Sequence, residues 1–172
     1  SDVIFDCIYR LAERQVIRLD NYLAGSFILL QPTSPIRLKD DLVSFCKQIN
    51  NLDRGLSMVS VNKNYSALKD IYKIINFSDV KSDFLLGHIG EKLPEVRDTK
   101  KHSDSAFIDG SLYLGLMSIL KEQGFMPEAK TLAFPLSIKR SIDIDTEKEF
   151  KDALALIKEL QNLGIEYVSP KI

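Results

Sequence analysis

The stretch Ser26-Phe-Ile-Leu-Leu-Gln-Pro-Thr-Ser-Pro35 joins a short apolar run to a rigid polar turn, and it decides the fold that we expect. The apolar run predicts a buried strand. The two prolines end that strand, because proline fixes φ and donates no hydrogen bond to a neighbouring strand. After the turn, Leu42, Phe45, Cys46 and Ile49 recur at helical spacing, with Asp40 as a cap. A helix is therefore expected directly after the turn.

The order of elements around this stretch predicts the fold class. Residues 3–11 keep helical spacing before the strand, and residues 56–61 form a second strand-like run after the helix. Helices alternating with strands are typical of crossover units on a mostly parallel sheet. We therefore expect a Rossmann-like α/β fold with a mostly parallel sheet, in one domain that spans residues 1–172.

The second half of the chain is less regular. Strands are expected at residues 71–75, 106–116 and 131–136, with a short helix at 116–123 that Gly124 closes. Residues 87–105 are polar and aperiodic, which predicts a long loop that acts as a ligand lid or as a dimerisation arm. The capping box Thr146-x-x-Glu149 predicts the start of a final amphipathic helix.

Composition excludes several classes of protein. Among 172 residues, 23 are basic and 24 acidic, which gives a net charge of −1. A broad surface for nucleic acid or for an anionic membrane is therefore not expected. No apolar run approaches the roughly 18 residues that a membrane-spanning helix needs. Cys7 and Cys46 have no C-x-x-C spacing, which fits a reducing cytoplasm.

The string Ser141-Ile-Asp-Ile-Asp-Thr-Glu147 holds the first candidate site. In an extended segment, Asp143 and Asp145 lie on one side, roughly 6 to 7 Å apart. Two carboxylates facing one space suit Mg²⁺, which prefers hard oxygen ligands. The acids could instead simply complement the N-terminal end of the following helix.

Two other segments carry candidate ligand contacts. Gln31 offers a donor and an acceptor at the carboxyl end of a strand, where open α/β sheets bind ligands. Asp109-Gly110 interrupts an apolar strand, and glycine there permits close approach of a ligand or marks a bulge. A purely structural turn at 31–35 remains the alternative for the first segment.

Taken together, these strings resemble the acylneuraminate cytidylyltransferases, which are the CMP-sialic acid synthetases and their relatives. Residues 29–37 look like the family's L-Q-P-T-S-P-L-R, and residues 141–147 look like its S-I-D-I-D-T-E. Residues 108–113 are similar to its N-G-x-x-Y strand, with Asp109 in place of asparagine, and Leu68-Lys69 looks like its Leu-Lys pair. The resemblance covers the C-terminal portion of the family pattern.

The resemblance implies a function. A homodimeric enzyme would transfer CMP from CTP to a nine-carbon 2-keto sugar acid and release pyrophosphate. Asp143 and Asp145 would act in catalysis by holding Mg²⁺. The implied substrate-binding residues are Gln31, Thr33, Ser34, Asp109 and Gly110, with Lys69 contributed by the neighbouring subunit or a lid.

The sequence also departs from the family pattern. The family's glycine-rich phosphate-binding loop does not occur in these residues, and Arg97-Asp-Thr-Lys-Lys101 stands where relatives carry R-R-Q or R-Q-Q. Lys100 and Lys101, with Arg97, could meet an anion or simply be solvated. Two other functions remain open: a different Asp-x-Asp nucleotidyl- or glycosyltransferase, and a non-catalytic remnant that keeps only the dimer surface.

Overall fold

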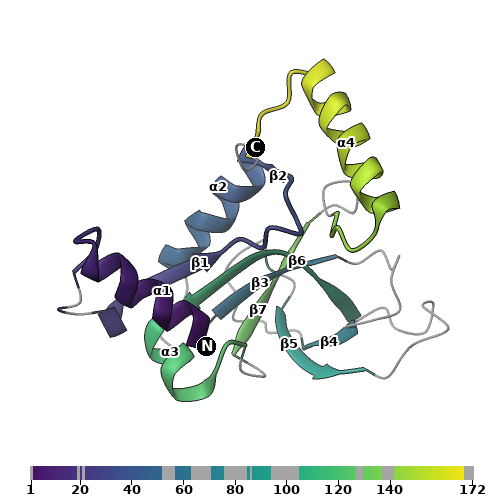
Figure 1. Ribbon diagram of the computed structural model, residues 1–172. Helices are drawn as coiled ribbons and strands as arrows, with labels where there is room; N and C mark the ends of the chain where they lie inside the picture. The colour runs from purple at the N-terminus through teal and green to yellow at the C-terminus, as the bar shows by residue number, and fades with distance from the viewer. Residues whose placement is uncertain are drawn as a thin grey trace.

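The computed structural model describes residues 2–18, 20, 22–51, 57–62, 71–75, 85, 87–93, 105–126, 130–136 and 142–168. Its helices are α1 (Asp2–Glu13), α2 (Lys39–Lys47), α3 (Met117–Gln123) and α4 (Glu147–Asn162), with the 3-10 turns η1 (Tyr22–Ala24) and η2 (Gln48–Asn51). Its strands are β1 (Ser26–Leu29), β2 (Arg37–Leu38), β3 (Ser57–Asn62), β4 (Ile71–Ile75), β5 (Gly87–Lys92), β6 (Ser105–Leu116), β7 (Thr131–Pro135) and β8 (Tyr167–Val168). Figure 1 shows their arrangement.

Five of the strands close into a ring. The hydrogen-bonded order is β6, β3, β7, β5 and β4, and β4 pairs with β6 again to complete the circle. Strand β1 adds to the outside of this ring by pairing antiparallel with β6. Among the described strands, β3 with β7 is the one parallel pair.

The expected Rossmann-like fold with a mostly parallel sheet is therefore wrong, because the strands form a closed, mostly antiparallel five-stranded barrel. The error came from the alternation of helices and strands, and the burial of the strands does not correct it. All six residues of β3 are buried, which is the pattern of a strand in a parallel sheet covered on both faces. A strand of a closed ring that is covered outside by a helix has the same pattern, so burial alone does not separate the two.

Two apolar clusters lie on opposite sides of the ring wall. Val59 and Val61 face the inner cluster, whereas Met58 packs with Phe45 of α2 on the outer side. This alternation follows from the two-residue period of a strand. In the outer cluster, Phe45 meets Phe134 edge to face, with ring centroids 5.2 Å apart. Helix α2 thus covers the outside of the ring.

Strand β6 departs from regular pairing at its centre. Between the pairs Val59↔Tyr113 and Val61↔Ile108, β3 advances by two residues while β6 advances by five. Residues 109–112 therefore form a bulge that holds three extra residues, and we call this segment the β6 bulge. Bulges bend a strand and are common beside functional sites. Figure 1 shows β6 curving across the ring from β4 to β1.

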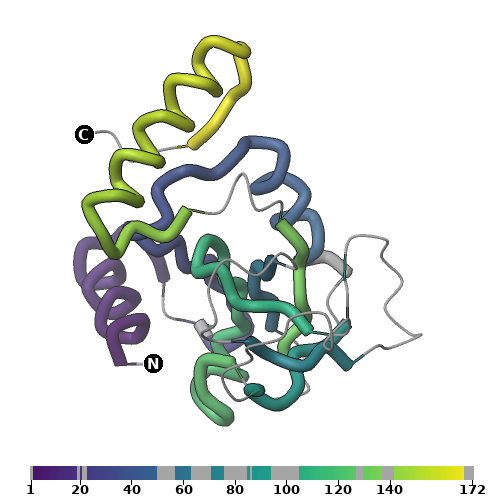
Figure 2. Tube along the Cα trace, turned by 90° about the vertical axis from the view of Figure 1, so that its right-hand side faces the viewer, coloured from purple at the N-terminus to yellow at the C-terminus, as the bar shows by residue number. Residues whose placement is uncertain are grey.

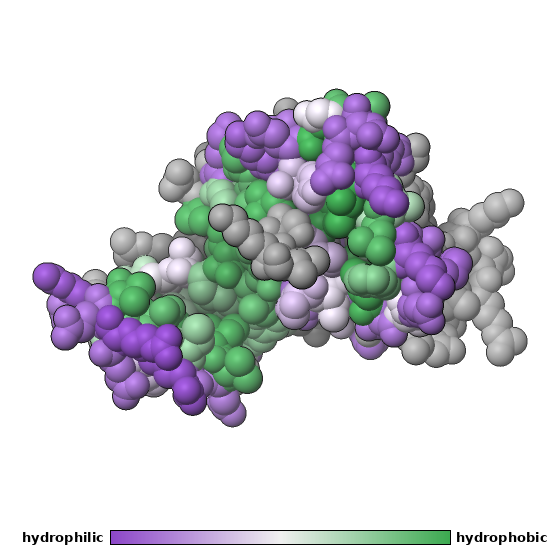
Figure 3. All heavy atoms as spheres, turned by 45° about the horizontal axis from the view of Figure 1, so that its top comes forward, coloured by the Kyte–Doolittle hydropathy of each residue, from purple (hydrophilic) through white to green (hydrophobic). Residues whose placement is uncertain are grey.

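Helix α4 packs on the small β2–β8 sheet rather than on the ring. Its Ala153 and Leu160 join Ile36 and Leu38 in a third apolar cluster. Figure 2 shows α4 lying across the top of the molecule, away from the ring strands. On the face shown in Figure 3, hydrophobic side chains gather between hydrophilic ones. Phe150 of α4 is 49% exposed.

The capping box of α4 is confirmed. The Thr146 Oγ1 accepts a hydrogen bond from the Glu149 N–H at 3.3 Å. The Glu149 carboxylate in turn accepts hydrogen bonds from the Thr146 hydroxyl and from the Asp145 N–H. These hydrogen bonds lower the pKa of Glu149, with the Thr146 hydroxyl as the main cause.

We expect Thr146→Ala to lower the free energy of unfolding by about 1 kcal/mol, as for other lost N-caps, while Thr146→Ser keeps it. Because folding lowers the pKa of Glu149, the stabilisation of the folded state by the Glu149 carboxylate is complete above the ordinary glutamate pKa. It is lost as pH falls through the lowered value. Urea unfolding of both variants at neutral and acidic pH tests this. Equal stability of Thr146→Ala and the native chain at neutral pH would contradict it.

Several local expectations also need correction. Residues 87–92 are strand β5 and not part of a loop, and residues 94–104 lie outside the described part of the chain. Leu38, not Asp40, is the N-cap of α2. Helix α1 forms as expected but has no buried residue. None of the described helices has the length and apolar character needed to cross a bilayer.

Candidate functional site

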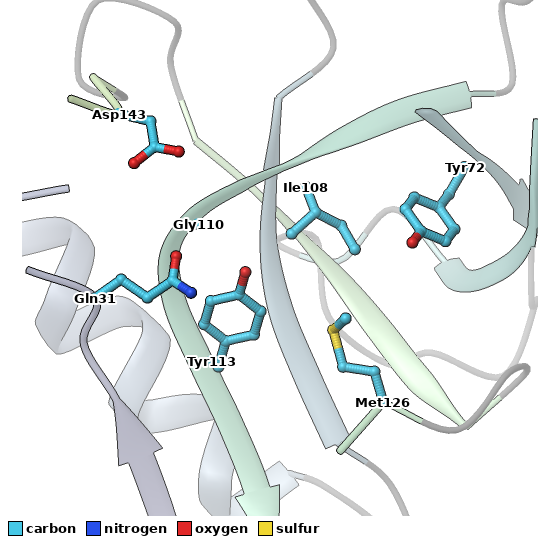
Figure 4. Close-up of a pocket in the computed structure, with 7 residues that line it drawn as sticks. All are labelled: Gln31, Tyr72, Ile108, Gly110, Tyr113, Met126 and Asp143. Carbon is cyan, nitrogen blue, oxygen red and sulfur yellow. The ribbon is translucent and has the colours of Figure 1, made fainter. Parts of the chain in front are cut away.

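A cavity of about 260 Å³ opens where the turn after β1, the β6 bulge and the segment before α4 meet. We call it the pocket. Its lining residues are Gln31, Tyr72, Ile108, Gly110, Tyr113, Met126 and Asp143. In Figure 4 the Gln31 amide, the Tyr113 hydroxyl and the Asp143 carboxylate point toward one space, and Tyr72 and Met126 lie on the opposite side. The pocket therefore has a polar end and an apolar end.

The turn at residues 31–34 forms the polar end. The Ser34 N–H donates to the Gln31 carbonyl at 3.2 Å, which closes the turn. The Thr33 carbonyl accepts from the Ile144 N–H at 2.8 Å. The buried Ser34 hydroxyl lies 3.5 Å from a carboxylate oxygen of Asp143. The turn thus holds the Asp143 segment beside Gln31, although 112 residues separate them.

Gly110 forms the floor of the pocket between the side chains of Gln31 and Asp143. Its φ of +76° is one that residues with a Cβ rarely adopt. A Cβ built on Gly110 would lie 2.8 Å from the Gln31 Oε1 and 3.4 Å from the Ser34 Oγ. Only a residue without a side chain leaves this end of the pocket open.

Asp109 does not line the pocket. Its side chain is 3% exposed and turns into the wall beneath the bulge. There it accepts hydrogen bonds from the Ser60 hydroxyl and from the Ser111 N–H. The Ser60 Oγ accepts from the Leu112 N–H at 2.8 Å. These two side chains replace the ladder hydrogen bonds that the bulge loses, and buried backbone groups require such partners.

Arg37 holds the other side of the bulge. Its Nε donates to the Ser111 carbonyl at 3.1 Å, and its Nη2 donates to the Gln31 carbonyl at 2.5 Å. Burial lowers the pKa of the Arg37 guanidinium, and the charge of Asp109 partly offsets this effect. The guanidinium nevertheless remains charged.

The structure brings together only part of the expected site. Gln31, Gly110 and Asp143 meet at the pocket, and Ser34 supports them. Thr33 contributes its carbonyl to the wall, as described above, rather than its exposed side chain to the pocket. Asp145 is exposed and is not among the described lining residues, and its N–H caps α4 through Glu149. The remaining candidates, which lie outside the described residues, are Lys69, Arg97, Lys100 and Lys101.

Sequence reasoning missed the apolar end of the pocket. Tyr72, Ile108 and Met126 pack against the inner cluster of the ring, and Tyr113 belongs to that cluster while its hydroxyl faces the polar end. Regular alternation would put residues 108, 110 and 112 on one face, but the bulge turns Tyr113 into the pocket instead. Met126 follows α3, where the sequence carried no signal.

The oxygen atoms around Gly110 fit Mg²⁺ only in part. Asp143 supplies a carboxylate, and the Gln31 amide and Ser34 hydroxyl oxygens lie close to it. Mg²⁺ in proteins often uses one or two carboxylates and keeps its other positions for water or phosphate. Within the described residues, no three His, Cys, Asp or Glu side chains gather as a metal-binding group. Of the residues that the structure describes, Asp143 alone would supply charge to a metal at this end.

No known protein family matches the sequence, and no curated protein is significantly similar to it.

Proposed function

We propose that the pocket binds a sialic-type 2-keto sugar acid and that the protein activates this acid with CTP. The products would be the CMP-sugar and pyrophosphate. One observation carries the proposal: Gln31, Gly110 and Asp143 line one cavity although they come from three distant strings. Those are the strings on which the resemblance to the cytidylyltransferases rests. The proposed homodimer and cytoplasmic location rest on that resemblance and on the cysteine pattern.

The shape of the pocket supports a ligand with two kinds of surface. A sugar acid presents hydroxyl and carboxylate oxygens to the amide of Gln31 and to the backbone at Gly110. Its carbon-rich side fits the aromatic and thioether side chains of Tyr72 and Met126. Sites for small molecules combine such apolar walls with a few fixed polar groups. This division of the lining favours a sugar over a uniformly charged ligand.

In the proposed reaction, the anomeric hydroxyl oxygen of the sugar acid attacks the α-phosphorus of CTP. A new oxygen–phosphorus bond forms, the bond to the bridging oxygen of the β-phosphate breaks, and pyrophosphate leaves. The hydroxyl proton passes to solvent or to a nearby carboxylate. Such transfers depend mainly on positioning and on charge stabilisation. Gln31 and the Gly110 backbone would hold the acceptor sugar in place.

Asp143 would hold Mg²⁺, and the resemblance implies Asp145 as a second ligand. When bound, the metal neutralises the negative charge of the phosphates. Because Asp145 is not among the described lining residues, we assign it the smaller part. Asp143 also accepts from the Ser34 hydroxyl, which fixes the carboxylate beside the pocket.

The test is pyrophosphate release from CTP and Mg²⁺ in the presence of sialic-, legionaminic- or pseudaminic-type acids. We expect turnover with at least one acid and a loss of about 100-fold or more in kcat for Asp143→Asn, which removes charge at the reacting centre. Asp145→Asn serves as the comparison, since it makes the same chemical change at a residue outside the described lining. We expect it to lose less than tenfold, roughly 1.4 kcal/mol of barrier.

Several outcomes would contradict the proposal. Native turnover in Asp143→Asn would remove Asp143 from the reaction. Stabilisation in a thermal-shift assay by UTP, GTP or TTP instead of CTP would favour a different nucleotidyl- or glycosyltransferase. Binding of the sugar acid without turnover would favour a non-catalytic protein, and absence of binding would reject the assignment of the pocket.

A further inference from the structure

We infer that Arg37 is the positioning residue of the pocket: its buried guanidinium sets the place of Gln31 relative to Gly110. The side chain is 6% exposed and does not line the pocket. It acts through two backbone carbonyls that belong to, or adjoin, lining residues. This role goes beyond the proposed function, because it concerns how the pocket is held open, whatever ligand the pocket takes.

The geometry of the two hydrogen bonds supports this role. Nη2 binds the carbonyl of Gln31, and Nε binds the carbonyl of Ser111, which directly follows Gly110. The guanidinium is planar and presents its donors in a fixed fork. One rigid group therefore sets the spacing between two chain segments that lie 80 residues apart.

The surroundings of Arg37 are built to hold it. The Asp109 carboxylate balances its buried charge, and the same carboxylate accepts from the Ser60 hydroxyl and the Ser111 N–H. The turn that Arg37 holds also carries the Thr33 carbonyl, to which the Ile144 N–H is bonded. A shift of the guanidinium would therefore move the turn, the bulge and the Asp143 segment together.

Arg37→Lys tests the fork, because lysine keeps the charge opposite Asp109 but carries all its donors on one nitrogen and lacks the planar fork. We expect this variant to fold. We also expect the side-chain amide resonance of Gln31 to shift or to split in ¹H–¹⁵N spectra. The Gln31→Glu variant, which lacks this amide, assigns the resonance. Lys39→Met is the control, since Lys39 lies two residues away and pairs with exposed Glu166. It should leave that resonance unchanged.

The kinetic test depends on the proposed function, whereas the test with the Gln31 amide resonance does not. In the pyrophosphate assay, Arg37→Lys should raise KM for the sugar acid by about 10- to 100-fold, the cost of an ångström-scale misplacement. KM for CTP should change less. Guanidinium at non-denaturing concentration should restore part of the loss in Arg37→Ala, compared with the same concentration of NaCl.

The outcomes separate the two proposals. A shifted Gln31 amide without turnover in any variant supports the positioning role and counts against the proposed reaction. An unchanged amide together with an unchanged KM overturns the positioning role. Loss of the folded state in Arg37→Lys also overturns it, because Arg37 would then serve the fold as a whole and not the pocket.

Discussion

Gly110→Ala should strongly weaken binding in the pocket while leaving the protein folded. The added Cβ would meet the Gln31 Oε1 at 2.8 Å, and Gln31 can yield only by swinging its amide out of the pocket. The methyl group would also occupy space at the floor of the pocket, next to Ser34 and Asp143. We expect affinity for the sugar acid to fall by about 100-fold, as for misplaced polar contacts. Isothermal titration of the purified protein with the acid panel measures this loss.

The control for this variant is Gly164→Ala. Gly164 has a φ of +66°, close to that of Gly110, and a Cβ there meets nothing within 4 Å. Both substitutions place a side chain in the left-handed region, at a cost of about 1 to 2 kcal/mol. The two variants should therefore lose similar stability, and only Gly110→Ala should lose the ligand. Equal affinities in both variants would show that Gly110 does not shape the site.

The pattern of residues was sufficient for most of the local structure. Thr146 and Glu149 identified the start of α4, because a capping box depends on neighbouring residues alone. The run at Ile71–Ile75 was correctly expected as a half-exposed strand. These features depend on spacing within one element, which the sequence displays directly.

The pairing of strands could not be obtained in the same way. Helix and strand alternation suggested parallel crossovers, but β6 pairs in turn with β4, β3 and β1. Which strands meet depends on the bend at the β6 bulge. That bend depends on the hydrogen bonds that the Asp109 carboxylate and the Ser60 hydroxyl accept from the backbone N–H groups of the bulge. Contacts between residues about 50 positions apart carry no local signal.

The difference between local and long-range signals also explains which site residues could be predicted from the sequence. Gln31 and Asp143 were recognised because each sits in a distinctive string, and their meeting could be expected from the resemblance. Asp109 was assigned to ligand binding because the resemblance implied that role for the Asp109-Gly110 strand. Its real partners, Ser60 and the bulge backbone, become visible only once β3 and β6 are paired.

Gly115→Ala should be the most destabilising substitution of those considered. Gly115 pairs with Phe27 between β6 and β1, and the ring of Phe27 lies directly over it. An added Cβ would come within 2.5 Å of the Phe27 Cε1, a distance that no real contact allows. The ring would have to leave its stack with Phe125, whose centroid is 6.2 Å away. We expect a loss of about 2 to 3 kcal/mol, as for an overpacked core, measured by urea unfolding.

A double-mutant cycle with Phe27→Leu identifies the cause of that loss. Leucine removes the ring that the new Cβ would strike, so Gly115→Ala should cost much less in the Phe27→Leu background. An equal cost in both backgrounds would mean that the strand itself, and not the ring, rejects alanine. Because β1 leads directly into the turn at residues 31–34, loosening β1 should also lower the affinity of the pocket for its ligand. Gly115→Ala should thus lower stability and ligand affinity together. By contrast, Gly110→Ala and Gly164→Ala should lower stability equally, and Gly110→Ala should lower affinity far more.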